Sequence, residues 1–532
     1  MIVLSFQYII KKPVLKISLF LLSLCLGSQA VAQELNTHIW QHDYWKNLLH
    51  YSGKKSVINA DSDFFLSPDG YKNPKSEYFA TLRAFADDDI SKANNHAICR
   101  YPARFDYIVR SLNLRKSYFP KPKCSEYQEY RQKVPIDTVS VLFAAENNFS
   151  PSSMMGHTFL KLGGNNKSGR HEHSFSYFAA LNKIDLKFYL DIITTGLDGA
   201  YILSPYSEKS AEYLYKEKRS LWEFELKLSP LEIERLKMHL WELKGSNIRY
   251  SLISHNCGTA VISILKTANS NLESENVKPF VTPMEYAKKL YNSEYINNIS
   301  LEPTDYVREK IKKNGVRNVL NANKSSRIEI SQHTNKDYTL LYLSPVYQDI
   351  HDVNNAYFDE MESKIAEISI GYDNRLDKAF IQNINILKMR SVLDYPISGE
   401  YSKHFKFAFE NNYAQTKTNL KPTVEFGLGY GSYAKTLAFY ILPKAGFRYN
   451  HISNIYLAPE IGIIANISDK IKIMSSYEHY LNSCRNNRGF NEKFSFYLGY
   501  RIADGTDIFA NYAHYASATN NNDFFFGIAY KF

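Results

Sequence analysis

The second half of the chain alternates apolar and polar residues in segments of about ten residues. In TVEFGLGY, for example, Phe426 and Leu428 share one face of an extended strand, whereas Glu425 lies on the other. About twelve such segments, separated by Asn, Asp, Gly and Lys, follow residue 326. A soluble β-sandwich also alternates, but an aromatic face opposite a small or polar face, repeated to the last residue, is typical of a transmembrane barrel. The pattern predicts an all-β antiparallel, outer-membrane-type barrel of about 12 strands over residues 326–532.

The last segment, FFFGIAYKF, indicates which face should meet lipid. One face of this strand carries five large apolar residues: Phe524, Phe526, Ile528, Tyr530 and Phe532. The opposite face carries Phe525, Gly527, Ala529 and Lys531. We expect the first face to meet lipid, Ala529 to face a polar lumen, and Lys531 to face the lumen or the interface.

The N-terminus has the layout of an export signal. Lys11, Lys12 and Lys16 precede the apolar run ISLFLLSLCL, and an A-x-A cleavage site ends at Ala32. The run is too short to span a bilayer. Residues 1–32 are therefore predicted to be a signal peptide. Together with the barrel, this signal predicts a protein of the bacterial cell envelope, in the outer membrane with a periplasmic N-terminal domain.

The first half combines predicted strands and helices. Residues 139–145, 157–163 and 173–180 are apolar runs typical of buried strands. In SPLEIERLKMHLWELKG, Ser229 is expected to cap a helix and Gly245 to end it. The expected organisation is a signal peptide at 1–32, a helical N-terminal region at 33–135, an α+β domain at 136–295, a linker at 296–325 and the barrel at 326–532.

Composition supports this organisation and excludes one class of partner. Aromatic residues make up 14% of the chain, with 41 Tyr and 32 Phe, and aromatic side chains favour strands. The formal net charge of +10 falls by three when the signal peptide is removed. No dense block of Lys and Arg remains, so we expect no nucleic-acid partner.

Four cysteines follow the signal peptide: Cys99, Cys124, Cys257 and Cys484. In an oxidising compartment an even set of cysteines can form two bridges. Cys99 and Cys124 are close in sequence and are the expected disulfide pair. If Cys257 stays a thiol, Cys484 is left without a cysteine partner.

Cys257 is the candidate nucleophile because it opens the predicted helix in HNCGTAV. A helix N-terminus favours the thiolate through its dipole and its free N–H groups, which can also serve as an oxyanion hole. A nearby imidazole would complete an activated nucleophile. The alternative is that Cys257 is a small core residue, which is the usual role of a buried cysteine at the start of an apolar helix.

No metal or cofactor is predicted. The sequence lacks a C-x-x-C motif, and His171 and His173 have no cysteine at zinc-ligand spacing. It also lacks a Gly-rich phosphate loop and a G-x-S-x-G motif.

Several blocks of the first half resemble the Lnb N-terminal periplasmic domain family. They are HDYWKNLLHY, DFFLSPDGYKNP, CRYPARF, SSMMGHTFLKLG, LWEFELKLSPLEIERLKMHLWEL and HNCGTAV, and they cover roughly residues 40–295. The resemblance implies a papain-like (NlpC-like) fold that moves an acyl chain from a phospholipid to a lipoprotein. By motif, His157 matches the base and Cys257 the nucleophile.

The order of His before Cys is also similar to circularly permuted papain-like enzymes, including the lecithin:retinol acyltransferase group. That group has a second polar residue on the strand after the histidine, and this similarity implies His173, with Ser176 as runner-up. Ser153, in the loop before His157, and Asn256 are the candidate substrate-binding residues.

The predicted function is thiol-dependent acyl transfer in the periplasm, with phospholipids or lipoproteins as partners and the barrel as an outer-membrane anchor. One alternative is an NlpC-like peptidase or amidase that acts on peptidoglycan. The other is a non-enzymatic pore or scaffold. The sequence does not indicate an oligomeric state.

Overall fold

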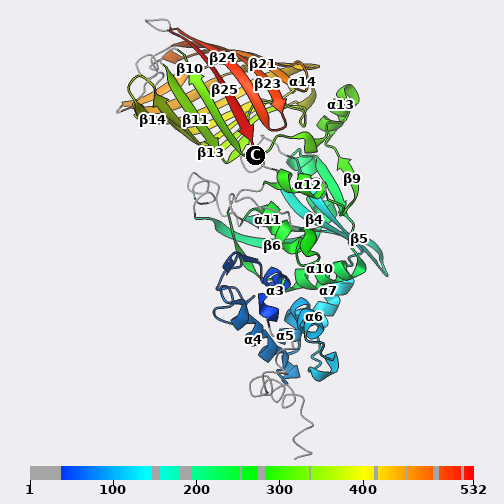
Figure 1. The fold of residues 1–532 in the computed structure, drawn as a ribbon. Helices are drawn as coiled ribbons and strands as arrows, with labels where there is room; N and C mark the ends of the chain where they lie inside the picture. Colours follow the sequence, from blue (N-terminus) through cyan, green and yellow to red (C-terminus); the bar gives the residue numbers. More distant parts are fainter. Residues whose placement is uncertain are drawn as a thin grey trace, which may run out of the picture. The chain divides into compact units, whose positions relative to one another are not determined.

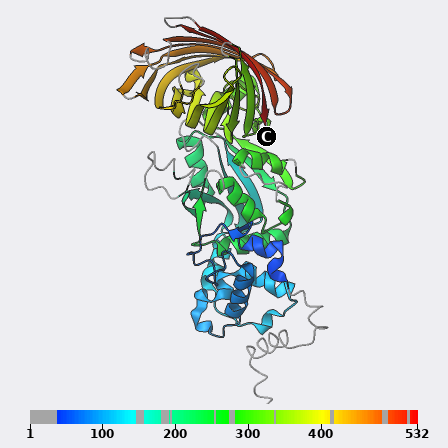
Figure 2. The same ribbon diagram turned by 60° about the vertical axis from the view of Figure 1, so that its left-hand side comes forward.

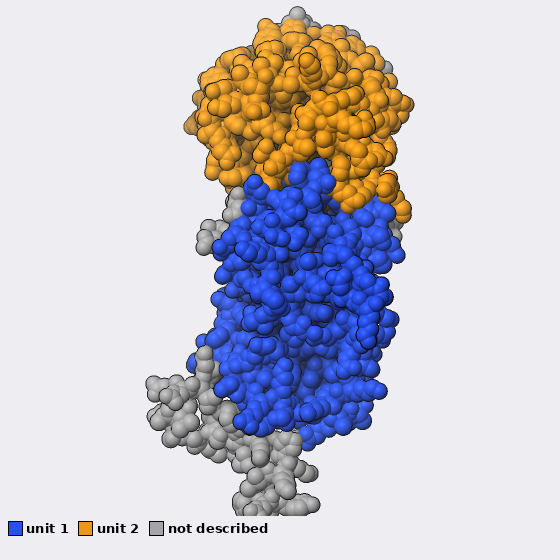
Figure 3. Space-filling view, turned by 90° about the vertical axis from the view of Figure 1, so that its right-hand side faces the viewer, with its two compact units in different colours: residues 1–143, 157–212, 221–301 blue, residues 144–156, 213–220, 302–532 orange. Residues whose placement is uncertain are grey.

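The computed structural model describes residues 38–145, 156–179, 191, 195–251, 255–272, 282–291, 293–334, 337–411, 417–450, 452–482, 491–516 and 521–532. The predicted signal peptide, Ser153 and Cys484 lie outside these residues. The chain divides into two compact units, which Figure 3 colours separately. Unit 1 comprises residues 1–143, 157–212 and 221–301, and unit 2 comprises residues 144–156, 213–220 and 302–532.

Unit 1 contains a seven-stranded sheet with the order β8-β6-β5-β4-β3-β7-β9. Its strands are β3 (Thr138–Ala144), β4 (His157–Asn166), β5 (Gly169–Ala179), β6 (Leu197–Pro205), β7 (Leu221–Leu226), β8 (Asn247–Tyr250) and β9 (Ile296–Glu302). The three apolar runs predicted as strands are β3, β4 and β5, which are neighbours in the sheet. Strands β4 and β5 form an antiparallel hairpin in which Leu160 pairs with Phe175.

The helices of unit 1 are α3 (Asp43–Leu48), α4 (Pro74–Phe85), α5 (Ala97–Arg100), α6 (Pro102–Ser111), α7 (Ser125–Lys133), α9 (Tyr206–Ala211), α10 (Pro230–Glu242), α11 (Cys257–Leu265) and α12 (Pro283–Tyr291). Helix α10 begins as predicted, because Ser229 and Glu232 form a reciprocal capping box. Helix α11 packs against β4 and β5. Its apolar side chains are buried there, among them Val261 and Ile264.

Shorter elements complete the helical part of the chain. They are β1 (Tyr51–Ser52), β2 (Lys55–Ser56), the 3-10 turns η1 (Ile39–Gln41), η2 (Ile90–Asn95), η3 (Lys116–Tyr118), η6 (Ser270–Leu272) and η7 (Val319–Asn321), and the π-turn η5 (Glu212–Lys216). Cys99 and Cys124, the pair expected from their closeness in sequence, form a disulfide with a Cα–Cα distance of 5.1 Å. Among the described helices, none is long and apolar enough to cross a membrane.

The stretch 296–325, predicted as a linker, is structured. Its first residues form β9, which pairs with β7 at the edge of the unit 1 sheet. Helix α13 (Asp305–Asn314) follows, capped by Thr304, whose side chain accepts from the N–H of Val307. Gly315, at φ +77°, ends α13 in a conformation that favours glycine. Local caps that the prediction overlooked therefore give this stretch regular structure.

Unit 2 is a closed antiparallel barrel of twelve strands, so the predicted barrel is confirmed (Figure 1). Its segments are β10 (Arg327–His333), β11 (Tyr338–Ser344), β12 (Val346–Gln348), β13 (Glu360–Asp373), β14 (Lys378–Val392), β15 (Ser402–Glu410), β16 (Lys421–Ala434), β17 (Leu437–Leu442), β18 (Lys444–Asn450), β19 (Ile452–Leu457), β20 (Glu460–Asn466), β21 (Ile471–His479), β22 (Leu481–Asn482), β23 (Glu492–Ala503), β24 (Thr506–Ala516) and β25 (Asn521–Lys531). The one short helix among them is α14 (Tyr395–Ser398), counted over the described residues.

The barrel closes because its first and last strands pair. Strand β10 pairs with β25, and β15 pairs with β16, so the ladder runs around the whole circle. Figure 2 shows from a second side how the strands curve round. Four of the twelve strands are interrupted, three of them at Pro345, Pro443 and Pro459 and one at Tyr480. Proline lacks an N–H for the ladder, which explains the first three interruptions.

The outer face of the barrel is apolar, as the alternation predicted. On β25, Phe526 is 49% exposed and Ile528 is 46% exposed, whereas Lys531 is fully buried inside the barrel. The expectation for Ala529 was wrong. Ala529 is fully buried in an apolar cluster inside the barrel, which also contains Phe509. The lumen at this level is filled by side chains contributed by other strands, which the sequence of β25 alone does not reveal.

Charged side chains that point into the barrel are paired with one another. Arg390 forms two hydrogen bonds to Glu460, at 2.7 and 3.0 Å, and Lys444 forms a third at 2.7 Å. Lys531 forms ion pairs with Asp352, at 2.9 Å, and with Asp507. Buried charges are tolerated when they are paired and hydrogen-bonded in this way.

Part of the lumen is filled by the segment 349–359, which joins β12 to β13. Ile350 is buried in the same apolar cluster as Ala529. The ring of His351 packs against that of Tyr497, with centroids 4.7 Å apart. Asp349 forms an ion pair with Lys364 at 2.9 Å. The segment is therefore anchored inside the barrel by both apolar packing and charge pairing.

A charge on the outer face of β25 should impair membrane insertion. Ile528→Arg places a guanidinium in hydrocarbon, which costs about 2–4 kcal/mol near the midplane. Ala529→Arg should also destabilise the barrel, because the added side chain has no space in the apolar cluster. Heat-modifiable gel migration and outer-membrane fractionation measure both effects. Asp504→Arg, at an exposed turn, is the matched control and should behave like wild type. Wild-type behaviour of Ile528→Arg would contradict the assignment of the lipid face.

The lumen, although it keeps a cavity of about 280 Å³ lined by Glu329, Lys364 and Arg390 among others, should not conduct ions steadily. We expect the wild-type protein to show no steady conductance after reconstitution into planar bilayers, because side chains and segment 349–359 occupy its interior. Replacing residues 350–357 by a short Gly-Ser linker should produce measurable channels, since it removes part of that filling. Steady wild-type conductance comparable to that of an open porin would contradict this reading of the lumen.

Candidate functional site

Cys257 is the first residue of α11 and is 2% exposed. The helix starts there because Asn256 caps it: the side-chain oxygen of Asn256 accepts from the backbone N–H of Thr259 at 3.1 Å. The hydroxyl of Thr259 donates in turn to the backbone carbonyl of Asn256 at 3.0 Å. The oxygen of Asn256, predicted to bind substrate, is thus engaged in fixing the position of Cys257.

Gly258 allows a close approach beside the thiol. A Cβ atom added at Gly258 would lie 3.2 Å from the side-chain oxygen of Asn256 and 3.3 Å from the Cα of Pro283, the first residue of α12. Both distances are tighter than ordinary contacts. A glycine after the cysteine is therefore required for α12 to pack against the start of α11.

Two tyrosines lie near the thiol. Burial raises the pKa of Tyr250, and the charge of Cys257 raises it further. Burial also raises the pKa of Tyr177, followed by the charges of Tyr201, Tyr250 and Cys257. The rings of Tyr177 and Tyr250 lie 5.3 Å apart. The hydroxyl of Tyr177 donates to the carbonyl of Ile248 at 3.3 Å. Two aromatic side chains thus lie near Cys257, and no sequence motif had pointed to either tyrosine.

His157 begins β4, directly after Gly156, which has φ +74°. The imidazole stacks on the ring of Phe178, with centroids 4.7 Å apart and planes at 12°. His157 is 9% exposed. Helix α11 packs against β4, but Tyr177, which lies near Cys257, and Phe178, on which His157 stacks, are consecutive residues of β5 and so lie on opposite faces of the sheet.

The two candidates for the third polar residue lie on opposite faces of β5. Side chains alternate along a strand, so Ser176 shares the face of Phe178, against which the imidazole of His157 stacks. His173 lies on the other face, opposite Leu162 of β4. The two-residue alternation of side chains could have shown from the sequence alone that His173 and Ser176 lie on opposite faces of this strand. The strand geometry favours Ser176, the runner-up, as the neighbour of His157.

The environments of these two residues also differ. Ser176 is 2% exposed, and its hydroxyl has no hydrogen-bond partner among the described residues. Such a group is available for a new partner when the imidazole moves or gains a proton. Burial lowers the pKa of His173, and the neighbouring charge of His171 lowers it further.

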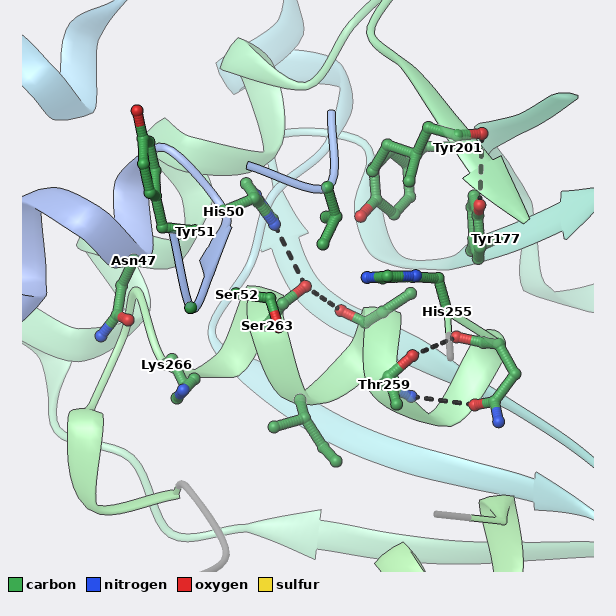
Figure 4. Close-up of a pocket in the computed structure, with 16 residues that line it drawn as sticks. Asn47, His50, Tyr51, Ser52, Tyr177, Tyr201, His255, Thr259, Ser263 and Lys266 are labelled. Atoms are coloured by element: carbon green, nitrogen blue, oxygen red, sulfur yellow. Dashed lines mark hydrogen bonds between the residues drawn. The ribbon is translucent and has the colours of Figure 1, made fainter. Parts of the chain in front are cut away.

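A cavity of about 240 Å³ lies beside α11 (Figure 4). His255 and Asn256, which precede Cys257, line it together with Thr259 and Ser263 from the same helix. Burial lowers the pKa of His255. The sequence contained no signal for this cavity, because its walls come from segments far apart in the chain.

The described residues contain no group of three or more His, Cys, Asp or Glu placed to hold a metal ion. The chemistry available at α11 is therefore described from its own side chains: a thiol at a helix N-terminus, an imidazole on the adjoining strand, and buried hydroxyls.

Three family descriptions match successive parts of the chain. Residues 126–293 match the Lnb N-terminal periplasmic domain, which confirms the resemblance over that range. Residues 37–111 match a separate domain of unknown function, so the resemblance drawn from residue 40 onward is narrower than expected. Residues 320–525, which contain the barrel, match another domain of unknown function. Among curated proteins, none matches the sequence.

Solved structures similar to this chain include several outer-membrane barrels. One is the KdgM porin in complex with disordered oligogalacturonate, with 8% identity and a TM-score of 0.25, covering 39% of this chain and 99% of that chain. Another is the COG4313 outer membrane channel from Pseudomonas putida F1, with 6% identity and a TM-score of 0.27, covering 40% and 96%. A third is outer membrane phospholipase A from Escherichia coli, with 11% identity and a TM-score of 0.25, covering 39% and 90%. The barrel itself rests on its strand pairing, and these likenesses carry no functional argument.

The geometry predicts how the thiol reacts. We expect Cys257 to be alkylated by a small reagent such as iodoacetamide with a midpoint below about pH 8, because the N-terminus of α11 favours the thiolate. His157→Ala should slow this reaction by about tenfold or more at pH 7, since it removes the expected base. Ser176→Ala should have a smaller effect in the same direction, and His173→Ala should have none. Rates are measured by mass spectrometry of the Cys257 peptide. Equal rates in all three variants and the wild type would contradict the assignment.

Proposed function

This envelope protein carries an Lnb N-terminal periplasmic domain ahead of an outer-membrane-type barrel, and we propose on that premise that the domain is a cysteine-dependent acyltransferase that acts on phospholipid or lipoprotein acyl groups. The observation that carries the proposal is the position of Cys257. It is a buried thiol at the first residue of α11, and α11 packs against the strand that begins at His157.

The proposed reaction has two steps. In the first, the thiolate of Cys257 attacks the carbonyl carbon of an acyl ester; the carbon–oxygen bond breaks, a thioester forms, and the lysophospholipid leaves. His157 takes the thiol proton and returns it to the leaving oxygen. In the second, an amine or water attacks the thioester and releases the acyl group, which regenerates the thiol. Backbone N–H groups of the first turn of α11 stabilise the oxyanion in both steps.

Ser176 is proposed as the positioning residue for His157. Its hydroxyl is buried on the face of β5 over which the imidazole stacks on Phe178. A hydroxyl there can accept a hydrogen bond from a ring nitrogen and hold the imidazole in one orientation. His173 lies on the opposite face of β5, which it shares with Tyr177.

The outer-membrane barrel supports a lipid substrate. Its outer face presents a continuous band of apolar side chains, so the protein is anchored in a membrane that contains phospholipid. The peptidoglycan alternative uses the same thiol chemistry and differs only in substrate. The paired charges and the segment 349–359 that narrow the lumen disfavour the pore alternative.

We expect purified protein reconstituted with phospholipid vesicles to release lysophospholipid and to accumulate an acylated Cys257 peptide. Cys257→Ser should reduce release on the order of a thousandfold or more, because the nucleophile is removed. His171→Ala, at a half-buried position of β5 close to the β4–β5 turn, is the matched control and should retain activity. Mass spectrometry of lipids and peptides measures both products.

The same preparation distinguishes the alternatives. Release of muropeptides from purified sacculi, lost in Cys257→Ser, would replace the acyltransferase with a peptidase or amidase. Correct membrane insertion with neither product in the wild type would leave only a binding or scaffold role.

A further inference from the structure

Among the described residues, the cavity beside α11 is lined by a cationic side chain and by no carboxylate. Thr259, Ser263 and Lys266 line it from one side of α11, and the loop after α3 contributes His50 and Tyr51 (Figure 4). Among the described residues that line the cavity, none is Asp or Glu. Lys266 brings positive charge, and several hydroxyl and imidazole groups bring hydrogen-bonding capacity.

A buried chain of hydrogen bonds ends at one wall of the cavity. The hydroxyl of Ser263 lies 3.1 Å from Nδ1 of His50. Nε2 of His50 lies 2.8 Å from Nε2 of His239 in α10. Nδ1 of His239 lies 3.3 Å from Oε2 of Glu242, one turn further along α10. The two histidines and Glu242 are all at least 96% buried, so the chain runs through the interior, and at this cavity it ends at His50 and Ser263.

At the inner end of this chain, Glu242 lies beside Arg104, which also binds a second carboxylate, that of Glu77. Oε1 of Glu242 accepts from the backbone N–H of Arg104 at 2.9 Å, and the guanidinium of Arg104 donates to Glu77 at 2.8 Å. Glu77 also accepts from the N–H groups of Leu66 and Ser67. The guanidinium of Arg104 is shared with Glu242, since its Nε lies 3.8 Å from Oε2 of Glu242. Burial raises the pKa of Glu242 to about 7, although the charge of Arg104 and the backbone N–H groups of Ala103 and Arg104 lower it.

Both imidazoles in the chain are neutral near pH 7. Burial lowers the pKa of His239 to about 3, and the charge of Arg104 lowers it further. Burial, followed by the charges of His239, Arg104 and Lys266, lowers the pKa of His50 well below its usual value. A proton at Glu242 therefore reorients the hydrogen bonds of the chain rather than charging a ring.

Two arrangements of protons satisfy every member of the chain. When Glu242 is ionised, His239 donates to it and accepts from His50. His50 then accepts from the hydroxyl of Ser263, which presents lone pairs to the cavity. When Glu242 is protonated, every bond reverses and His50 donates to Ser263. The hydroxyl proton of Ser263, which can rest on the carbonyl of Ala260 at 2.8 Å, is then available to a ligand.

We propose that this cavity binds a small oxyanion, a molecule that carries a carboxylate or phosphate group, and that the chain from Glu242 to Ser263 delivers one hydrogen-bond donor to it. An anion favours the arrangement in which donors point to the cavity. The protonation of Glu242 and the binding of the anion therefore favour each other. The described lining contains Lys266 and neither Asp nor Glu, which also favours a negatively charged ligand.

The backbone conformation of His50 is a further observation in favour of a binding site. His50 has φ +53°, in the left-handed region that is uncommon for residues other than glycine. Backbone strain of this kind is retained where a specific side-chain position is needed. Here the strain directs one imidazole to Ser263 on α11 and to His239 on α10 at the same time.

Titration at this site depends on the groups that face Glu242. From the elements packed around it these are Arg104 (α6), His239 (α10), Tyr44 (α3), Tyr101 and Tyr127 (α7). Burial raises the pKa of Glu242 to about 7 and lowers that of His239 to about 3. Glu242 is therefore the group expected to titrate between pH 6 and pH 8. The expected pH dependence is therefore that of a single proton.

Sulfate is the appropriate first probe, because it keeps its charge between pH 6 and pH 8. Isothermal titration calorimetry on the full-length protein in detergent should show sulfate binding about tenfold more tightly at pH 6 than at pH 8, as expected for one linked proton with a pKa near 7. Titrations at pH 8 in two buffers of different ionisation enthalpy should show uptake of close to one proton. Acetate and methyl phosphate, titrated at pH 6, distinguish a carboxylate ligand from a phosphate ligand.

Variants test the parts of the site separately. Lys266→Gln and Ser263→Ala should each weaken sulfate binding by about tenfold. Glu242→Gln should bind equally at both pH values, because its amide donates to His239 as the protonated carboxyl does. Lys227→Gln, on an exposed position of unit 1, is the matched control and should bind like wild type.

The measurement involves no turnover, so it does not depend on the chemistry proposed for Cys257. Absence of sulfate binding to the wild type at both pH values would overturn the proposal. So would wild-type affinity in both Lys266→Gln and Ser263→Ala, or a Glu242→Gln variant that keeps the tenfold pH dependence.

Discussion

The pairing of β10 with β25 is the constraint on which the second half of the molecule depends. In lipid every backbone N–H and C=O must find a partner within the protein, and only a closed ladder leaves no edge unpaired. Closure determines which residues face outward, and these are the apolar ones. Paired charges and the segment 349–359 occupy part of the interior that closure creates.

Helix α11 has a comparable role in the first half. Its first residue carries the thiol, and its N-cap, Asn256, sets where that thiol lies. Thr259 and Ser263 of the same helix and its C-cap residue, Lys266, line the neighbouring cavity. One helix thus contributes both to the surroundings of Cys257, which include two tyrosines, and to the hydrogen-bonding wall at Ser263. A shift of α11 would alter both at once.

Much of this architecture could be predicted from local patterns. The two-residue alternation of β25 predicts its lipid-facing residues, and the helix start at Cys257 follows from its apolar periodicity. The fate of Ala529 could not be predicted, because it depends on Phe509 of the next strand. The same holds for the chain from Ser263 to Glu242. His50 and His239 are 189 residues apart, and no local sequence pattern brings them together.

The register of the closing pair also constrains how the protein is assembled. Arg327, at the start of the barrel, lies opposite Lys531, near the end of the chain. An even number of antiparallel strands therefore returns the chain to the side from which it entered. The segment that leads into the barrel and the last residue emerge on the same side of the membrane. Neither end of the barrel therefore has to cross the membrane relative to the other.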